Sequence, residues 1–303
     1  MFQALTKPTS PQAVVLLTLT MFLWAGNHVL GRWAGDHIPP MTLAFFRWGI
    51  AGALMLPLAA ADLRRDWPVI RANLPLMLVL SVLGSGVYNT LQYIALTSTT
   101  VSNAAIINSW APVLIALLGA AVFRDRIRPV QFAGIALSLA GVAVVILHGE
   151  FERLATLSFN RGDLVMIIAT AIWALYTTLL RYRPAISTLS FAAFTFAVAG
   201  LVNLPLAGYE YAAGLEIRWS WAVLAAIFYA AVLASVAAYY FYAAAVDVLG
   251  ATRTGSFIHL IPMFATLLAL VIVNEVPQIY HALGFGLIVV GVVLAQKAGG
   301  GQR

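Results

Sequence analysis

The sequence contains no cysteine and few charged residues, and both shortages exclude classes of protein. Without cysteine, the chain of 303 residues can form neither a disulfide bond nor a metal site built from thiolates. Charged residues make up only 9% of the chain and hydrophobic residues 62%, whereas a soluble domain has about 25% charged residues. A soluble fold of this length needs more polar side chains to cover its surface. We therefore expect lipid to surround most of the chain.

Long apolar runs occupy nearly the whole sequence. A helix needs about 20 mostly apolar residues to cross a hydrocarbon layer of about 30 Å. Ten runs meet this criterion, near residues 12–34, 40–61, 73–96, 100–122, 128–147, 162–182, 187–208, 219–244, 250–273 and 279–297. The first run has no small-residue cleavage site, so we interpret it as a retained helix rather than a signal peptide. The sequence predicts an all-α membrane protein with ten transmembrane helices in one domain, residues 1–303.

Lys and Arg are distributed unevenly between the two ends of these helices. Of the 17 basic residues, twelve fall on the side of the N-terminus, four on the other side and one, Arg47, inside a helix. Basic residues near helix ends favour the cytoplasm, so both termini are predicted to be cytoplasmic. This distribution accounts for the net charge of +6 without a nucleic-acid partner. The twelve are Lys7, Arg64, Arg65, Arg71, Arg124, Arg126, Arg128, Arg181, Arg183, Arg253, Lys297 and Arg303; the four are Arg32, Arg153, Arg161 and Arg218.

The second half of the chain repeats features of the first. An offset of about 150 residues relates Ser85 to Ser235, Pro112 to Pro262, Asp125 to Glu275, Gly134 to Gly284 and Gly141 to Gly291, and an offset of 149 relates Trp24 to Trp173. We expect one repeat over about 12–147 and another over about 162–297. Five helices in each repeat is an odd number, so the two repeats must have opposite orientations in the membrane. Inverted repeats around a binding site at the membrane midplane are common in secondary transporters.

Polar residues follow one face of two repeat-related helices. The run 73–96 carries Ser81, Ser85, Tyr88 and Gln92 at helical spacing, and the run 219–244 carries Ser235, Tyr239 and Tyr242. Polar side chains are costly in hydrocarbon, so these faces are expected to line a shared central cavity. The alternative is that they only join helices by hydrogen bonds.

Aromatic and polar residues deep in other helices extend this candidate site. An aromatic amino acid or similar solute needs flat walls and a few hydrogen-bonding groups. The predicted substrate-binding residues are Trp24, His28, Tyr88, Gln92, Asn108, Trp110, Trp173, Tyr176 and Tyr239. For tryptophans near helix ends we favour an interfacial belt instead; these are Trp33, Trp48, Trp67, Trp219 and Trp221.

Arg47 and two prolines are the remaining unusual residues within the apolar runs. A buried charge needs a partner, and either Asp36, Glu275 or a substrate carboxylate can provide it; we favour a structural ion pair. Pro112 and Pro262 each remove a helical hydrogen bond and bend the helix. The carbonyl groups that they free can bind solute or allow hinge motion, and a bend used only for packing is the alternative.

Several of these features resemble a known superfamily. Ten helices, the pairs Trp24-Ala25 and Trp173-Ala174, the segment Phe46-Arg47-Trp48, and the repeated proline, acid and glycines resemble the EamA-type branch of the drug/metabolite transporters. The segments 24–28 and 88–93 further resemble YddG-type exporters of aromatic amino acids. The resemblance implies export of an amino acid or similar metabolite by alternating access, in the inner membrane of a bacterium. It also implies that Tyr88, Gln92, Trp110 and Trp173 occupy cavity positions.

Three other functions were compared with amino-acid export. A multidrug or other metabolite exporter uses the same scaffold and differs only in substrate. An intramembrane enzyme needs a nucleophile and base, paired acids or metal ligands, and the sequence shows no such motif: catalytic residues, metal sites and cofactors are all predicted to be absent. A channel needs a ring of like groups around a symmetric pore, which two unequal halves do not provide. The expected partners are a small-molecule substrate and the lipid bilayer.

Overall fold

Helices form all the regular structure in the described part of the chain. The computed structural model describes residues 9–123, 129–150, 160–249 and 257–297. Both chain ends and Asp125, on which sequence predictions fall, lie outside these residues. Seven of the helical spans are long and apolar enough to cross a membrane, and three shorter apolar helices (α8, α15 and α16) accompany them.

The described residues of the first half form eight α-helices and one π-helical segment. They are α1 (Ser10–Ala34), α2 (Pro40–Leu58), α3 (Ala60–Ala72), α4 (Leu74–Ser81), η2 (Val82–Val87), α5 (Tyr88–Leu96), α6 (Val101–Asn108), α7 (Ala111–Phe123) and α8 (Pro129–Ile146). Most of α3 falls between two predicted spans, because the helix is too short and too polar to cross a membrane. The helix is short and polar on one side: Asp66 and Ile70, four residues apart, are buried, while Arg64 and Arg65 are exposed.

The second half begins with α10 and ends with α16. Its helices are α10 (Arg161–Leu179), η3 (Leu180–Tyr182), α11 (Thr188–Ala212), α12 (Trp221–Phe228), η4 (Tyr229–Ala237), α13 (Ala238–Leu249), η5 (Phe257–His259), α15 (Leu260–Ile272) and α16 (Ile279–Lys297). The elements α4, η2 and α5 form one continuous span, and so do α12, η4 and α13.

A π-helical segment lies at the same place in both halves. The segment η2 contains Ser85, and η4 contains its repeat partner Ser235. π-helical turns are rare, and they occur frequently at functional sites because they turn the following side chains to a new face. The polar residues after each segment, on α5 and α13, are those that the sequence analysis placed at the cavity.

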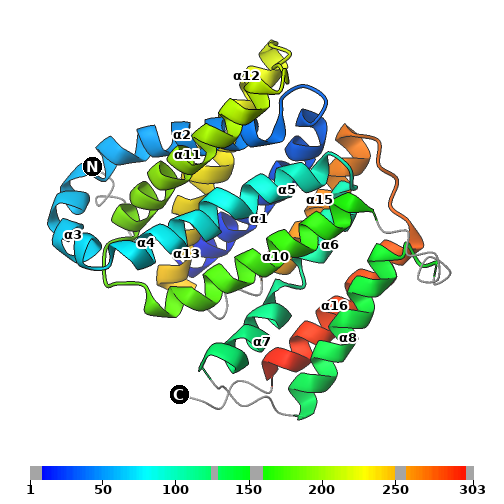
Figure 1. Ribbon diagram of the computed structural model, residues 1–303. Helices are drawn as coiled ribbons and strands as arrows, with labels where there is room; N and C mark the ends of the chain where they lie inside the picture. Colours follow the sequence, from blue (N-terminus) through cyan, green and yellow to red (C-terminus); the bar gives the residue numbers. More distant parts are fainter. Residues whose placement is uncertain (1–8, 124–128, 151–159, 250–256, 298–303) are drawn as a thin grey trace.

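Two helix pairs, each with one member from each half, pack closely through glycine. A methyl group added at Gly52 of α2 would lie 2.9 Å from the Cα of Ala197 on α11, and one added at Gly141 of α8 would lie 2.7 Å from the carbonyl oxygen of Gly284 on α16. The pairs α2–α11 and α8–α16 are therefore at backbone contact, as small residues permit between membrane helices. The α8–α16 pair lies at one edge of the bundle, beside α7 (Figure 1).

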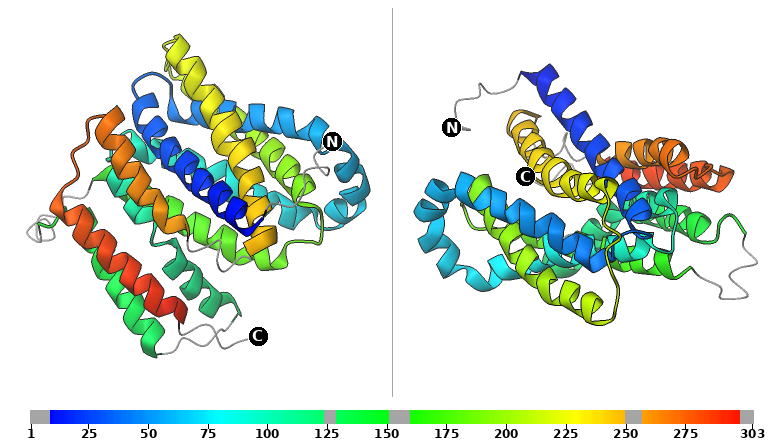
Figure 2. Two further views of the ribbon diagram at one scale, coloured as in Figure 1. Left: turned by 180° about the vertical axis from the view of Figure 1, so that it is seen from behind. Right: turned by 90° about the horizontal axis from the view of Figure 1, so that it is seen from above.

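The other contacts between the halves are reciprocal. Helix α1 packs against α13 and α15 of the second half, and α10, its counterpart, packs against α5 and α7 of the first (Figures 1 and 2). This exchange brings the beginning of each half against the middle of the other.

Polar and apolar side chains are distributed in the opposite way to those of a soluble protein. Large apolar side chains point outward, among them Leu201 at 68% exposed and Val271 at 78%. Polar and charged residues such as Arg47, Asn89 and Asp163 are buried instead. Only lipid makes this arrangement favourable, since it solvates apolar surface and leaves polar groups to bond inside the bundle.

Candidate functional site

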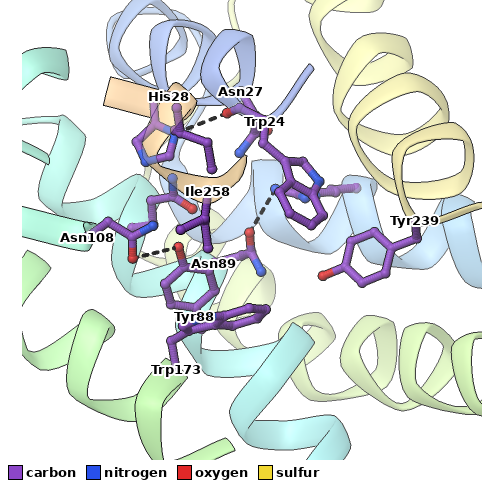
Figure 3. A pocket seen from close by; sticks show the side chains of 12 residues that line it. Trp24, Asn27, His28, Tyr88, Asn89, Asn108, Trp173, Tyr239 and Ile258 are labelled. Atoms are coloured by element: carbon purple, nitrogen blue, oxygen red, sulfur yellow. Dashed lines mark hydrogen bonds between the residues drawn. The ribbon is translucent and has the colours of Figure 1, made fainter. Parts of the chain in front are cut away.

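One pocket lies where α1, α5 and α6 of the first half face α10, α13 and α15 of the second. The space between its lining atoms is about 430 Å³, which includes open solvent, and its cavity volume is about 40 Å³. The lining residues are Trp24, Asn27, His28, Arg47, Tyr88, Asn89, Gln92, Asn108, Trp173, Tyr239, Ile258 and Ile261; we call this the central pocket (Figure 3). Seven of the nine predicted substrate-binding residues are among them.

Two aromatic pairs form walls of the central pocket, and each pair joins the two halves. The rings of Tyr88 and Trp173 lie 4.9 Å apart, and those of Trp24 and Tyr239 lie 5.6 Å apart in an edge-to-face arrangement. Trp24 and Trp173 are repeat partners, so each pair takes its tryptophan from an equivalent place in one half. The Tyr88 hydroxyl donates a hydrogen bond to Oδ1 of Asn108 at 3.2 Å. Flat walls with a few fixed polar atoms suit a ligand with an aromatic or apolar part.

Arg47 reaches the central pocket from α2 and is only 2% exposed. Its Nε donates to Ser235 Oγ at 2.8 Å, and its Nη1 donates to Asn89 Oδ1 at 2.8 Å and to the Tyr93 hydroxyl at 3.0 Å. The guanidinium also lies 4.6 Å from the centre of the Trp48 ring. All these partners are neutral. The predicted structural ion pair is therefore wrong within the described side chains, where no carboxylate lies within 4.0 Å of Arg47.

Of the two acidic partners expected for Arg47, Asp36 is exposed and Glu275 is held at a helix end, as is Glu210. Glu275 accepts a hydrogen bond from the Val101 backbone at the start of α6 and pairs with Arg32 at 3.6 Å. Burial raises the pKa of this carboxyl group. Glu210 accepts from the backbone N–H groups of Met41 and Thr42 at the start of α2, at 3.1 and 2.7 Å. A carboxylate is favoured at these positions because the first N–H groups of a helix have no partner within it.

His28 presents one nitrogen to the pocket without a partner. Its Nδ1 lies 3.0 Å from the Trp24 carbonyl oxygen, which can only accept, so in this contact Nδ1 carries the hydrogen. In the neutral ring Nε2 is then an acceptor. It is buried and has no hydrogen-bond partner among the described residues. This leaves a fixed lone pair at the pocket.

The two prolines lie close to the pocket but not in the middle of a helix. Pro112 is the second residue of α7, which begins after a break at Ser109 and Trp110, and Pro262 is the third residue of α15, after the short 3-10 turn η5. The predicted mid-helix bend is therefore a break, at which proline costs little because the first helical positions need no donor. Proline cannot donate to the carbonyl group four residues before it. Those carbonyl groups belong to Asn108 and Ile258, repeat partners that both line the pocket.

Three predictions of individual side chains differ from the structure. Trp110 is buried but does not line the pocket, and its Nε1 has no partner among the described residues. Tyr176 lies behind Trp173, with the ring centres 5.2 Å apart, and packs against Gly84. Trp48, predicted to lie in an interfacial belt, is fully buried against Phe196.

The sequence analysis missed four lining residues. Asn27 and Asn89 stand beside the predicted His28 and Tyr88, and their position in apolar runs is a signal that could have identified them. Ile258 and Ile261 are apolar residues among many, and no sequence signal distinguishes them.

A second buried polar group, also missed, lies where several helices begin or end. Its members are Thr99, Asn103, His148, Asp163 and His281; we call it the Asp163 cluster. Asp163 is fully buried and accepts hydrogen bonds from Thr99 and from Asn103 Nδ2. The backbone N–H of Gln278 donates to His281 Nδ1, so His281 Nε2 carries the hydrogen that it donates to Asn103 Oδ1 at 3.1 Å. His148 Nε2 lies 3.2 Å from Asn103 Nδ2 and 3.9 Å from Asp163.

Known proteins similar to the chain are membrane transporters. An uncharacterized transporter of Archaeoglobus fulgidus is 29% identical over 92% of this chain and 96% of its own. A probable terminal-alkyne amino-acid exporter of Streptantibioticus cattleyicolor is 25% identical over 96% of each chain. An S-adenosylmethionine/S-adenosylhomocysteine transporter of Chlamydia muridarum is 26% identical over 64% of this chain and 63% of its own. A solved crystal structure has a TM-score of 0.61, with 23% identity over 94% of this chain and 96% of its own.

The family comparison covers almost the whole sequence. The model of the EamA-like transporter family matches twice, over residues 11–147 and 160–296. Together with the apolar spans and the buried polar interior, these matches identify a multi-pass membrane transporter. The chain belongs to the EamA-like transporter family.

Proposed function

We propose that this transporter exports amino acids with aromatic or hydrophobic side chains, or closely similar metabolites. The substrate binds in the central pocket, between the two halves of the chain. The observation that carries the proposal is the composition of the pocket: two aromatic pairs stand beside a buried arginine and an unpaired histidine nitrogen. An aromatic amino acid needs both kinds of group, one for its ring and the other for its charged ends.

The proposed architecture is ten transmembrane helices in two inverted sets of five. Seven long apolar helices and three shorter ones support it, as do the two separate matches of the family model. The reciprocal packing of α1 and α10 has the form that a pseudo-twofold relation requires. The uneven distribution of Lys and Arg supports an inner-membrane location with both termini in the cytoplasm.

Alternating access is the proposed mechanism. The substrate enters the pocket from the cytoplasm, and a change of helix packing then opens the pocket to the other side. Pro112 and Pro262 are the proposed hinge positions, because each follows a break in helical hydrogen bonding beside a pocket-lining residue.

Export of another metabolite is a second candidate, favoured by one relative. The Chlamydia protein carries the name of an S-adenosylmethionine/S-adenosylhomocysteine transporter. Such a solute also combines a flat ring with an amino-acid end, so the same pocket chemistry suits it. Direct comparison of the two substrate classes separates the candidates.

Flux into proteoliposomes tests the proposal. Purified transporter is reconstituted, and uptake of labelled L-tryptophan, L-phenylalanine, L-leucine and S-adenosylmethionine is measured with and without a pH gradient. We expect the aromatic amino acids to be transported fastest. No uptake of any amino acid, with rapid uptake of S-adenosylmethionine, would favour the second candidate.

The variant Trp173→Ala connects this flux to the pocket. It removes one wall, so we expect aromatic amino-acid flux to fall by about tenfold or more while the protein still folds and inserts. Trp221→Ala is the matched control, since Trp221 is 87% exposed. Equal flux in the two variants would remove the central pocket from the transport pathway.

A further inference from the structure

We infer that Arg47 binds the carboxylate of the substrate and that His28 Nε2 accepts a hydrogen bond from its ammonium group. The central pocket would thus select zwitterionic α-amino acids and disfavour simple amines and organic cations. This assignment deepens the proposed function and rests on it.

The first argument is the electrostatics of Arg47. A guanidinium is always charged, and its burial without an anionic partner is costly. Its recorded hydrogen bonds use Nε and Nη1 only, and no described residue accepts from Nη2. A carboxylate supplies both the opposite charge and acceptors for the remaining N–H groups.

The second argument is that no nearby acid is available to compensate this charge. Glu275 and Glu210 are held at helix ends, and Asp163 is enclosed in its own cluster. None of the twelve pocket-lining residues is acidic. A pocket with a fixed positive charge and no lining carboxylate attracts anions and repels cations.

The central pocket also contains acceptors that do not bond to Arg47. His28, Asn108 and Ile258 lie together in Figure 3, away from Tyr239. His28 offers Nε2, which has no partner among the described residues, and Oδ1 of Asn108 accepts from the Tyr88 hydroxyl. Pro112 and Pro262 cannot donate to the backbone carbonyl groups of Asn108 and Ile258. Arg47 is bonded instead to α5 and η4. The pocket therefore offers both the N–H donors of Arg47 and the acceptor Nε2 of His28, which match the two charged groups of an amino acid.

A ligand series on the intact wild-type protein tests the assignment without any substitution. L-Phenylalanine carries both charges, phenethylamine lacks the carboxylate and 3-phenylpropanoate lacks the ammonium. Binding to detergent-solubilised transporter is measured by calorimetry. Hydrogen bonds to charged groups are strong, so we expect L-phenylalanine to bind about 10- to 100-fold more tightly than either analogue.

Two substitutions assign the charges to residues. Arg47→Gln should remove the preference for L-phenylalanine over phenethylamine, and Arg47→Lys should restore part of it, because charge is kept and the planar fork is lost. His28→Ala should remove the preference for L-phenylalanine over 3-phenylpropanoate. If Arg47→Gln does not fold, the ligand series on Arg47→Lys and on the wild-type protein still tests the assignment. Equal affinity of the wild-type protein for phenylalanine and phenethylamine overturns it.

The outcomes separate this inference from the proposed function. Transport of L-phenylalanine with an unchanged ligand preference in Arg47→Gln would overturn the inference and leave amino-acid export standing. Absence of amino-acid binding, with 3-phenylpropanoate binding that depends on Arg47, would instead overturn the proposed function and retain the anion site.

Discussion

The Asp163 cluster and the central pocket are both buried groups of polar side chains, but they differ in how completely their atoms are paired. In the Asp163 cluster, hydrogen bonds run in sequence from Gln278 through His281 and Asn103 to Asp163. In the central pocket, His28 Nε2 lacks a partner, and Arg47 lacks an opposite charge among the described side chains.

Complete pairing indicates polar groups with a structural role, and incomplete pairing indicates polar groups that are available to a ligand. Buried polar atoms that satisfy one another fix the positions of the helices that carry them. Buried polar atoms that are only partly satisfied cost free energy, which a bound molecule with complementary groups can offset. We therefore expect the Asp163 cluster to determine stability and the central pocket to determine selectivity.

Of the substitutions that test this division, Asp163→Ala is expected to have the largest effect, a loss of stability. It leaves the buried donors of Thr99 and Asn103 without an acceptor, and loss of one partner in a buried charged network costs roughly 3–5 kcal/mol. We expect a large drop in unfolding temperature in detergent, with the phenylalanine-to-phenethylamine preference unchanged in the folded fraction. Asp36→Ala is the control, since Asp36 is exposed. An altered ligand preference in Asp163→Ala would contradict the division between the two regions.

Tyr88→Phe is expected to have a smaller effect, on ligand affinity as well as on stability. The ring that packs against Trp173 is kept, but the hydrogen bond to Asn108 is lost. A neutral hydrogen bond contributes about 1 kcal/mol to the stability of the fold, so we expect a loss of about that size. Affinity for L-phenylalanine should also fall, by about three- to tenfold, because Asn108 is no longer held at the pocket wall. Binding calorimetry and thermal unfolding measure the two quantities. Tyr211→Phe, at an exposed position, provides the comparison, and a stability loss without an affinity change would make Tyr88 structural.

Asp66→Asn should have the smallest effect on stability, and the size of this effect should depend on pH. Asp66 lies on α3, outside the membrane spans, and accepts hydrogen bonds from Arg65 and from the Ser187 backbone at the start of α11. Arg65 above all holds the pKa of Asp66 well below its usual range. A carboxyl group with a lowered pKa stabilises the folded state above its unfolded pKa of about 4, and this contribution is lost as pH falls.

The wild-type protein should therefore unfold at a higher temperature than Asp66→Asn at pH 7, and the gap should narrow below about pH 4. Asp36→Asn should show no such gap. If the difference in unfolding temperature does not depend on pH, the shape of the Asp66 side chain rather than its charge stabilises the fold.

Hydrophobicity and spacing in the sequence were sufficient to predict the helical membrane class and most aromatic residues of the pocket. Apolar runs reflect the thickness of the lipid layer, which is the same for every span. Trp24, Tyr88 and Trp173 could be found because a tryptophan or tyrosine deep in a span has few other roles. The sequence also predicted a transporter of the EamA-type branch, and the match to the family model confirms it.

Details that depend on helix rotation could not be predicted. Trp110 lies at the break between α6 and α7 and does not line the pocket, although its depth in the predicted span favoured a place there. The partners of Arg47 depend on η4, a π-helical segment for which no sequence signal was identified. Short polar helices such as α3 are invisible to a criterion based on membrane-spanning length.

The close glycine contacts of α2 with α11 and of α8 with α16 restrict how the molecule can move. Each pair takes one helix from either half of the polypeptide, and at backbone contact the two members cannot part without opening a void. Under the proposed alternating access, each unit that moves therefore contains segments from both halves of the chain. The boundary between them does not follow the order of the chain, so cutting the gene at the junction of the repeats would not yield two independent moving bodies.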